Sequence, residues 1–310
     1  MKVLITPRGF ANNGMKFIKE MEKKGLEVNY NDTGLSYSAE HFLNLAKNSD
    51  AIIVGVDTID RKVIDSCPKL KVICKFGVGT DNIDVEYAKE KGIFVGRTVG
   101  SNSNSVAEHV MSYIYCDSKN LFNSIKEVKN HQWNKYTGRE IDKKTLGIIG
   151  FGAIGKHLAK QATGVGMNVL VHDVFDISNE EQSEYNVQQE NLENILKKSD
   201  YISLHLPLTK STEDLISKKE LNMMKENSCL INAARGGIVN ENDLYEALTK
   251  GEIRSAFFDV FSTEPPASDN KLLALNNFFL TPHTGARTTE ADIRTCGMSA
   301  QIIMDKLNKF

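Results

Sequence analysis

Short apolar runs alternate with amphipathic stretches along the first hundred residues of the chain. The run at 51–56, Ala-Ile-Ile-Val-Gly-Val, is typical of a strand buried on both faces of a parallel sheet. The pattern predicts five strands, at residues 2–6, 26–30, 51–56, 70–74 and 93–95. It also predicts helices between them, at about residues 13–24, 38–47, 60–66 and 84–91. Asp84 is placed to cap the last of these helices and Gly92 to end it.

The same alternation returns after a polar turn at 100–105, Gly-Ser-Asn-Ser-Asn-Ser. One long helix is predicted from about residue 105 to 126. Six strands are predicted after it, at residues 145–149, 168–172, 201–204, 228–232, 255–258 and 278–280. Helices are predicted between these strands, at about residues 153–165, 191–198, 217–224 and 241–250. A final helix is expected at about 288–309, with Thr288 or Thr289 as its N-cap.

Two alternating blocks predict two α/β domains, each built on a doubly wound parallel sheet. The final helix has no sheet of its own to complete, so we expect it to return to the first domain. The domain boundaries expected are therefore 1–100 plus 286–310 for one domain and 101–285 for the other. The two segments that cross between them, near residues 100 and 286, are expected to act as a hinge.

The overall composition excludes several classes of protein. Of 310 residues, 41% are apolar and 25% charged, which indicates a soluble globular chain rather than a disordered one. The net charge is only −2 with both signs mixed, so neither nucleic acid nor an anionic membrane is an expected partner. No apolar run approaches the roughly 20 residues that span a bilayer. The N-terminus opens with one short strand and then turns polar, unlike a signal peptide, so the cytoplasm is the compartment expected.

The five cysteines are scattered and form no CxxC pair. Cys74 and Cys229 lie inside apolar runs and are expected to be small core residues. Neither a disulfide framework nor a metal site is predicted.

A glycine-rich loop, Gly150-Phe151-Gly152-Ala153-Ile154-Gly155, lies between a predicted strand and a predicted helix. In that context it matches a dinucleotide-binding loop. Gly150 would make the tight turn, Gly152 would let the backbone approach the pyrophosphate, and Gly155 would let the helix lie close to its strand. The backbone N–H groups of Ala153 and Ile154, at the helix start, would bind phosphate oxygens. A close-packed turn without a ligand is the alternative.

Asp173 ends the strand that follows the glycine loop. A carboxylate at this point accepts hydrogen bonds from the adenosine ribose hydroxyls and repels a 2′-phosphate. No Arg follows in residues 174–177, so NAD is favoured over NADP as the cofactor. An exposed acid at the end of a strand is the alternative for Asp173.

Three short stretches in the last quarter of the chain place a reactive side chain beside a Gly or Pro. They carry Arg235 before Gly236, Glu264 before Pro265, and His283 after Pro282. Each falls just past the end of a predicted strand, where open α/β sheets bind ligands. A cation, a carboxylate and an imidazole beside a nicotinamide are suited to moving a hydride to or from a 2-oxo acid. A strand cap, a surface acid and a structural turn histidine are the respective alternatives.

The motifs GFGAIG, NAARGGIVNENDL, FDVFSTEPP and TPHTGA together resemble the D-isomer-specific 2-hydroxyacid dehydrogenase family, most of all its phosphoglycerate dehydrogenase-like branch. The resemblance extends over essentially the whole chain, including residues 76–84. It implies a Rossmann NAD-binding domain, a flavodoxin-like substrate domain, and a catalytic triad of Arg235, Glu264 and His283. Arg235 would bind and polarise the oxo acid, His283 would exchange a proton with its oxygen, and Glu264 would hold the imidazole in one tautomer.

The resemblance also implies contacts with the cofactor beyond the glycine loop and Asp173. The further residues expected to line the cofactor are Val106, His205, Pro207, Thr212, Ala233, Asp259 and Gly285. For His205, a role in loop packing is an equal alternative. The remaining histidines, at positions 41, 109, 131, 157 and 172, are interpreted as surface or packing residues.

On the substrate side, Val78 and Gly79 match the family loop whose backbone N–H groups hold the substrate carboxylate. Phosphoglycerate dehydrogenases usually place an arginine near residues 54–58, where this chain has Asp57. Arg8 is a candidate to replace that charge, with Arg97 a weaker one; a solvated loop residue is the alternative for Arg8.

The resemblance predicts an NAD-dependent oxidoreductase acting on a D-2-hydroxy acid and its 2-oxo acid. D-3-phosphoglycerate dehydrogenase and a dinucleotide-sensing regulatory protein remain alternatives. A homodimer is implied, with the long helix after residue 104 and its neighbouring segment as the contact. Trp133 would lie near this contact or pack locally.

Overall fold

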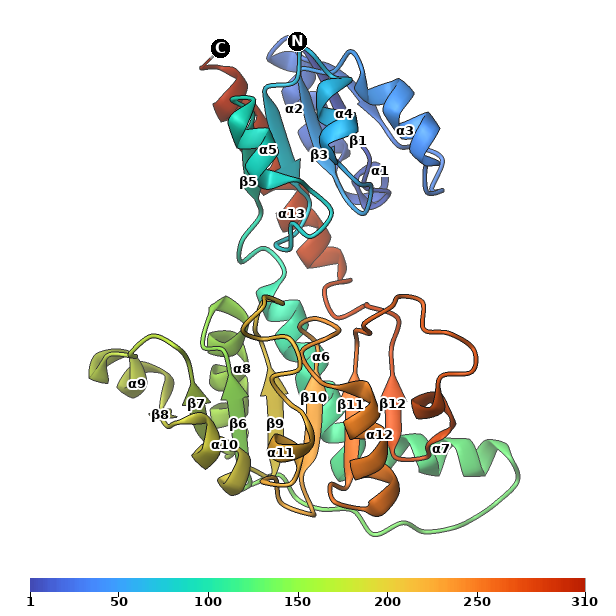
Figure 1. The fold of residues 1–310 in the computed structure, drawn as a ribbon, viewed down its shortest axis with the longest axis vertical. Helices are drawn as coiled ribbons and strands as arrows, with labels where there is room; N and C mark the ends of the chain where they lie inside the picture. Colours follow the sequence, from blue (N-terminus) through green and yellow to red (C-terminus); the bar gives the residue numbers. More distant parts are fainter. Residues whose placement is uncertain (310) are drawn as a thin grey trace. The chain divides into compact units, whose positions relative to one another are not determined.

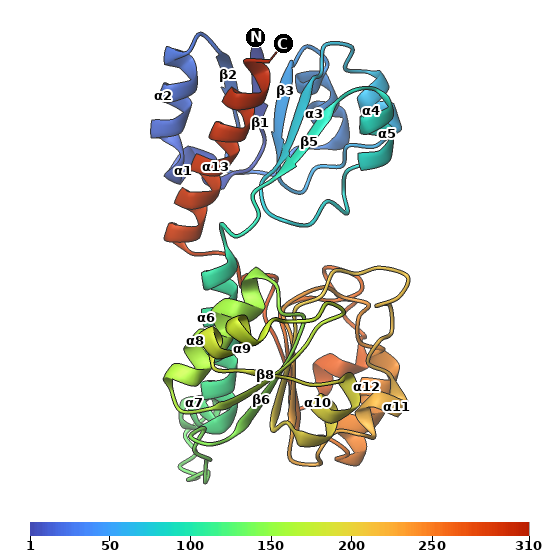
Figure 2. The same ribbon diagram turned by 90° about the vertical axis from the view of Figure 1, so that its left-hand side faces the viewer.

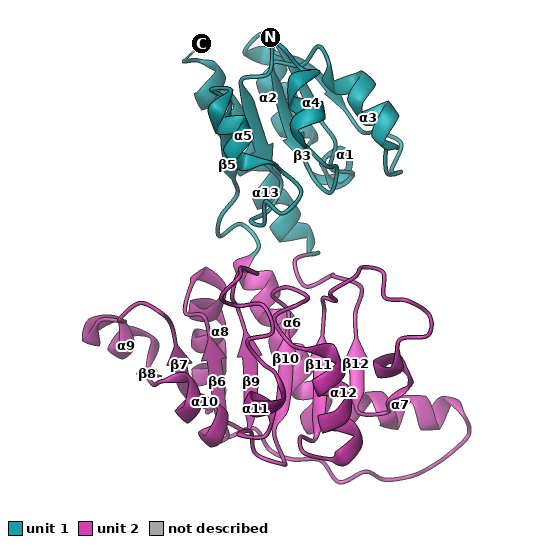
Figure 3. Cartoon of the chain, in the orientation of Figure 1, with its two compact units in different colours: residues 1–102, 287–310 teal, residues 103–286 magenta. Residues whose placement is uncertain are grey.

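The computed structural model describes residues 1–309. It divides into two compact units, residues 1–102 with 287–310 and residues 103–286 (Figure 3). Each unit contains one sheet, and every strand pairing in both sheets is parallel (Figure 1). The predicted fold class, α/β with two parallel sheets, is confirmed.

Unit 1 has a five-stranded sheet in the order β2-β1-β3-β4-β5, which is the flavodoxin-like order. Its strands are β1 (Lys2–Ile5), β2 (Glu27–Tyr30), β3 (Ala51–Val54), β4 (Val72–Lys75) and β5 (Phe94–Arg97). One face is covered by α1 (Gly9–Asn13), α2 (Met15–Lys23) and α13 (Thr289–Leu307), and the other by α3 (Ala39–Ala46), α4 (Arg61–Asp65) and α5 (Val85–Glu90) (Figure 2). All four residues of β3 are buried, because this strand is central and covered on both faces.

The capping residues of unit 1 agree with the sequence pattern. Asp84 accepts a hydrogen bond from the backbone N–H of Tyr87 at the start of α5, and Thr288 accepts one from Ala291 at the start of α13. The helix α13 packs against α1, α2 and β4. The last helix of the chain therefore covers the sheet built by the first block of the sequence.

Unit 2 has a seven-stranded sheet in the order β12-β11-β10-β9-β6-β7-β8. Its strands are β6 (Thr145–Ile149), β7 (Asn168–His172), β8 (Gln188–Gln189), β9 (Tyr201–Leu204), β10 (Cys229–Asn232), β11 (Ser255–Phe258) and β12 (Phe278–Leu280). The first strand, β6, lies between β7 and β9, so the strand order reverses there as in Rossmann folds.

The helices of unit 2 lie on both faces of its sheet (Figure 2). One face carries α6 (Ser103–Ser118), α7 (Leu121–Lys129), α8 (Ala153–Gly164) and α9 (Asn179–Tyr185). The other carries α10 (Leu192–Lys198), α11 (Lys218–Leu221) and α12 (Glu241–Lys250), and a 3-10 turn, η1 (Lys271–Ala274), precedes β12.

The prediction of a single long helix at about 105–126 is wrong, because two helices occupy this region. The first, α6, ends at Ser118 and α7 begins at Leu121. Asn120 between them adopts a left-handed conformation with φ 50°, and its side chain donates a hydrogen bond to the carbonyl oxygen of Thr137 at 3.1 Å. Asn tolerates this conformation better than most residues, and the helical spacing of apolar residues continues on both sides, so periodicity alone does not reveal the break.

Other differences concern short elements. The helix expected at 217–224 covers only Lys218–Leu221, while α1, α9 and β8 were not predicted. These elements are brief or polar, and tertiary contacts define them more than local pattern does.

The cysteines are free thiols, and Cys74 and Cys229 are fully buried as predicted. Within residues 1–309, no helix combines the length and the hydrophobicity that crossing a membrane requires.

Candidate active site

The carboxyl edge of the unit 2 sheet gathers most of the residues singled out in the sequence. Because all seven strands are parallel, the loops that follow them emerge at one edge. Gly150 follows β6, Asp173 follows β7 and His205 follows β9. Arg235, Asp259 and His283 lie in the loops after β10, β11 and β12, respectively. This edge is therefore the candidate site.

The glycine loop fits a dinucleotide. Gly150 has φ 99°, and a Cβ there would lie 2.4 Å from the carbonyl oxygen of His205, so the loops after β6 and β9 touch at the point where the strand order reverses. A Cβ at Gly155 would lie 2.4 Å from the carbonyl oxygen of Gly150, which fits the close helix packing predicted. A Cβ at Gly152 would meet nothing within 4 Å. Gly152 gives α8 no side-chain cap, so the N–H groups of its first turn are available to an anion.

Asp173 is held beside the glycine loop by backbone hydrogen bonds. Its carboxylate accepts from the N–H of Phe151 at 2.7 Å and from the N–H of Phe175 at 3.2 Å. This places the acid next to the phosphate-binding turn, where a carboxylate can accept from ribose hydroxyls.

The loop after β9 contains a half-buried histidine, His205, one ring nitrogen of which is buried and unsatisfied. The Nε2 atom of His205 lies 2.9 Å from Oγ of Ser203, while Nδ1 is buried with no partner among the described residues. Burial lowers the pKa of His205 to about 4, so the ring is neutral. Further along this loop, the hydroxyl of Thr212 donates to the carbonyl oxygen of Pro207 at 2.6 Å. An orphaned buried nitrogen at this edge suits a site that a ligand completes.

His283 and Glu264 form a hydrogen-bonded pair. Nδ1 of His283 lies 2.8 Å from Oε2 of Glu264, and Oε1 of Glu264 accepts from the N–H of Phe261 at 3.0 Å. The carboxylate is thus fixed by its own loop and orients the imidazole. Both side chains remain accessible, 52% for His283 and 41% for Glu264.

The loop that carries Arg235 is fixed by Asn232, which is fully buried at the end of β10. The Asn232 side chain donates to the carbonyl oxygen of Arg235 at 2.9 Å and accepts from the N–H of Ala234 at 3.1 Å. A Cβ at Gly236 would lie 1.9 Å from the carbonyl oxygen of Phe261, so the loops after β10 and β11 touch where no side chain would fit. Unit 2 therefore brings the Arg235 loop against the loop of Glu264.

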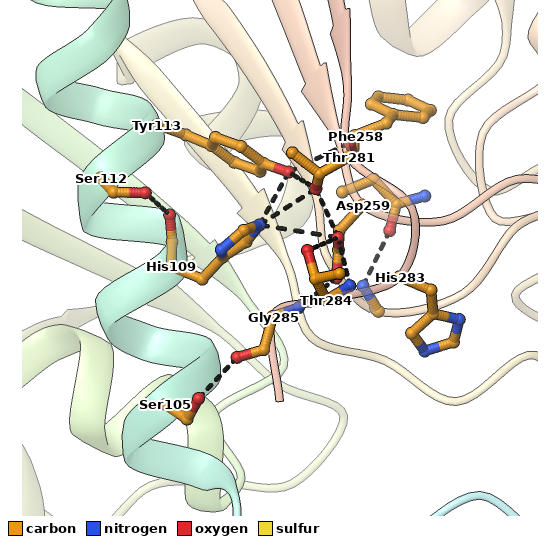
Figure 4. A network of polar contacts seen from close by, with 12 residues as sticks. Ser105, His109, Ser112, Tyr113, Phe258, Asp259, Thr281, His283, Thr284 and Gly285 are labelled. Atoms are coloured by element: carbon orange, nitrogen blue, oxygen red, sulfur yellow. Dashed lines mark hydrogen bonds and ion pairs between the residues drawn. The ribbon is translucent and has the colours of Figure 1, made fainter. Parts of the chain in front are cut away.

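Asp259 lies at the centre of a polar network (Figure 4). One carboxylate oxygen accepts from the hydroxyl of Thr281 at 2.5 Å and the N–H of Thr284 at 2.8 Å, and the other accepts from the N–H of Gly285 at 2.7 Å. Burial raises the pKa of Asp259, but the nearby His109 ring, the Thr281 hydroxyl and the two backbone N–H groups outweigh this effect and hold the pKa below its usual value.

The helix α6 borders the same network. The hydroxyl of Ser105 donates to the carbonyl oxygen of Gly285 at 2.7 Å, and the neighbouring Val106 is buried. His109, which the sequence pattern assigned to the surface or to packing, does pack against Tyr113, and it also lies within hydrogen-bond distance of Thr281. The second contact was not predicted, because sequence spacing along one helix gives no information about a loop 172 positions away.

In unit 1, the loops at the carboxyl edge carry Arg8, Asp57, Val78 and Gly79. The carboxylate of Asp57 accepts from the hydroxyl of Thr6 at 2.5 Å, so this acid is bound within its own unit. Arg8 is exposed just before α1. The backbone of Gly77, which precedes Val78, has φ 128° and its N–H donates to the hydroxyl of Thr98 at 2.8 Å.

Comparisons with known proteins point to one family. Residues 111–285 match the family model described as D-isomer specific 2-hydroxyacid dehydrogenase, NAD binding domain. D-3-phosphoglycerate dehydrogenase of Methanocaldococcus jannaschii is 40% identical to this chain. The alignment covers 94% of this chain but only 54% of that protein. Hydroxypyruvate reductase of Thermotoga maritima is 36% identical over 88% of the chain and 92% of its own length.

Among solved structures, D-lactate dehydrogenase from Aquifex aeolicus complexed with NAD and lactic acid is 30% identical, with a TM-score of 0.82. The alignment covers 99% of this chain and 96% of that one. The chain thus matches some relatives along nearly their whole length and spans about half the length of the phosphoglycerate dehydrogenases that it resembles.

Proposed function

The chain belongs to the D-isomer specific 2-hydroxyacid dehydrogenase family, and we propose that it interconverts a D-2-hydroxy acid and its 2-oxo acid with NAD. The observation that carries this proposal is the His283–Glu264 pair, 2.8 Å between Nδ1 and Oε2, at the sheet edge that also carries the glycine loop. An oriented imidazole beside a dinucleotide loop is suited to coupling proton transfer with hydride transfer.

NAD supplies the hydride acceptor or donor when it is bound. The N–H groups of Ala153 and Ile154 would hold its phosphates, and Asp173 would accept from its ribose hydroxyls. The other residues that we propose to line it are Val106, His205, Pro207, Thr212, Ala233, Asp259 and Gly285. The family model for residues 111–285 is that of an NAD-binding domain, which supports this assignment.

The proposed catalytic roles rest on the His283–Glu264 contact and on the chemistry of the other side chains and backbone N–H groups. Because Glu264 binds Nδ1 of His283, Nε2 is the nitrogen left to exchange a proton with the substrate oxygen. The guanidinium of Arg235 would pair with the substrate carboxylate and polarise the adjacent carbonyl. The N–H groups of Val78 and Gly79 are proposed as further donors to that carboxylate.

Two substrate classes remain, and they differ by a phosphate group. A phosphorylated substrate, as for D-3-phosphoglycerate dehydrogenase, is favoured by the 40% identity to a protein of that name and by the exposed Arg8. A small unphosphorylated oxo acid is favoured by Asp57, a carboxylate in the loop near which phosphoglycerate dehydrogenases usually have an arginine. We propose the unphosphorylated class, because Asp57 is fixed by Thr6 at the edge where a phosphate would have to bind.

The experiment that tests this function is NADH oxidation with a panel of 2-oxo acids, with and without a phosphate group. Turnover of unphosphorylated acids supports the proposal, and preference for phosphohydroxypyruvate replaces it with the phosphoglycerate assignment. No turnover with any acid would favour a regulatory protein that senses the dinucleotide without reacting.

We also propose a homodimer formed through α6, α7 and the segment after them. The helix α7 has no buried residue, and Leu121, Phe122, Ile125 and Val128 on it are exposed. Trp133 is 78% exposed, which contradicts local packing and suits a subunit contact. Light scattering on Ile125→Lys should show a halved mass relative to Leu35→Lys, an exposed apolar site in unit 1; an unchanged mass contradicts this contact.

The cytoplasm is the compartment that we propose. All five cysteines are free and four of them are buried in the described structure, as is usual in reducing compartments.

A further inference from the structure

His283 has a backbone conformation that its surroundings must maintain. Its φ is 53°, in the left-handed region that non-glycine residues rarely adopt. Such a conformation is strained and persists only where neighbouring contacts impose it.

Asp259 provides those contacts on both sides of His283. It accepts from the hydroxyl of Thr281, two residues before, and from the N–H groups of Thr284 and Gly285, which follow directly. The N–H of His283 itself donates to the carbonyl oxygen of Thr281 at 3.0 Å. Figure 4 shows the carboxylate on one side of this loop, with the imidazole of His283 pointing away from it. The imidazole of His283 therefore points outward, while Asp259 holds the backbone on both sides of it. We call the hydrogen bonds from Thr281, Thr284 and Gly285 to Asp259 the clamp.

His109 on α6 lies next to the clamp. Nε2 of His109 lies 2.8 Å from the hydroxyl of Tyr113, 3.2 Å from that of Thr281 and 3.6 Å from Oδ1 of Asp259. The His109 and Tyr113 rings pack edge to face with centroids 4.5 Å apart, as expected for positions i and i+4 of a helix. The side chain of His109 is 20% exposed and that of Asp259 only 4%.

The donors and acceptors around Nε2 of His109 determine whether this nitrogen carries a hydrogen. The Thr281 hydroxyl donates its hydrogen to Asp259, and the Tyr113 hydroxyl donates to the carbonyl oxygen of Phe258 at 3.1 Å or to Thr281. Both hydroxyl hydrogens are therefore used, and Nε2 faces oxygens that can only accept. The geometry assigns an N–H to Nε2 of His109.

We propose that His109 is a positioning residue for the reaction. Its N–H orients the Thr281 hydroxyl toward the buried carboxylate of Asp259, and this carboxylate in turn holds the backbone on both sides of His283. His109 contacts neither His283 nor Glu264 in any described hydrogen bond, so it acts through the clamp. This inference rests on the proposed function of His283, but the clamp itself can be measured without turnover.

Amide hydrogen exchange tests the clamp directly. His109→Phe keeps an aromatic ring against Tyr113 and removes the N–H, whereas His109→Gln keeps an amide N–H of similar reach. We expect exchange at Thr284 and Gly285 to become at least about tenfold faster in the Phe variant, since losing about 1.4 kcal/mol of local stability gives that factor. The Gln variant should exchange close to the wild-type rate. Unchanged exchange in His109→Phe, or equal acceleration in both variants, overturns the proposal.

Turnover supplies the second readout. In His109→Phe we expect kcat to fall by about 10- to 100-fold, as for a misplaced catalytic group, with the Kd for NADH changed less than about threefold. The primary isotope effect with NADH deuterated at the transferred position should rise, because hydride transfer becomes more strongly rate-limiting. Recovery of kcat in His109→Gln supports the role of the N–H, and loss in both variants contradicts it.

A second variant replaces His109→Phe if that variant does not fold, and a third serves as a control. Thr281→Val removes the hydroxyl between His109 and Asp259 and should reproduce both changes. Ser112→Ala is the matched control on α6, because among the described residues its hydroxyl bonds only the backbone carbonyl of His109, at 2.6 Å. It should leave exchange and kcat within about twofold. If wild type turns over no oxo acid, the proposed function fails while the exchange result still decides the clamp.

Discussion

The loops at the carboxyl edges of the two sheets differ in how far their key side chains are exposed. In unit 2, Asp259 is 3% exposed and binds residues on both sides of His283. In unit 1, Arg8 is exposed, and Val56 in the loop after β3 is 77% exposed. Both sheets are parallel and both edges are competent to bind ligands. On our proposal, unit 2 holds the reacting groups, while unit 1 presents side chains that set the preferred substrate.

The first effect that separates the two edges is expected on cofactor binding. Asp173→Ala removes the acceptor for ribose hydroxyls, so NADH should bind about 10- to 100-fold more weakly, while NADPH changes by less than about threefold. Fluorescence titration of both cofactors measures this difference. Asp176→Ala, an exposed acid three residues later, is the matched control and should change neither affinity. Equal losses for NADH and NADPH in Asp173→Ala would remove the reason for choosing NAD.

A second effect concerns the stability of the unit 2 edge. Asp259 has a lowered pKa, so its ionised form stabilises the fold above the unfolded pKa, and this contribution is lost as pH falls through the folded pKa. Asp259→Asn should therefore reduce the free energy of unfolding at pH 7 by about 1–3 kcal/mol. In urea unfolding followed by circular dichroism, the difference in unfolding free energy from wild type should narrow as the pH falls below the ordinary aspartate pKa of about 3.9. A difference that stays constant with pH contradicts this account.

The sequence was most informative where one local rule determines the structure. The glycine loop, the N-caps Asp84 and Thr288, and the reactive residues just past strand ends depend on short-range chemistry and on parallel topology. The left-handed Asn120 breaks a helix whose apolar spacing continues, so the pattern gave no sign of it.

Contacts between distant segments could not be read from the sequence. His109 meets Thr281 only after α6 has packed against the sheet of unit 2, and nothing in the residues around position 109 specifies that meeting. Asp259 was expected to line the cofactor, and its contacts with Thr284 and Gly285 show an additional structural role. Such pairings depend on tertiary packing, which a single sequence does not encode in a local pattern.

The smallest effect is expected at the unit 1 edge. Arg8→Ala removes one exposed charge, so kcat/KM for phosphorylated oxo acids should fall only about two- to fivefold, with unphosphorylated acids unaffected. Asp57→Asn, which keeps an acceptor for Thr6, should raise kcat/KM for phosphorylated acids by a similar factor. Steady-state assays with matched pairs of substrates measure both changes. If these variants reduced kcat for all substrates alike, the division of roles between the two edges would be wrong.

The central claim is that the His283–Glu264 pair of unit 2 performs proton transfer. Its most direct test compares NADH oxidation and NADH binding in wild type and His283→Ala. We predict that kcat falls by about 10²- to 10⁴-fold, the usual contribution of a general acid–base, while the Kd for NADH stays within about threefold. Turnover that is unchanged in His283→Ala would contradict the assignment of this pair as the catalytic centre.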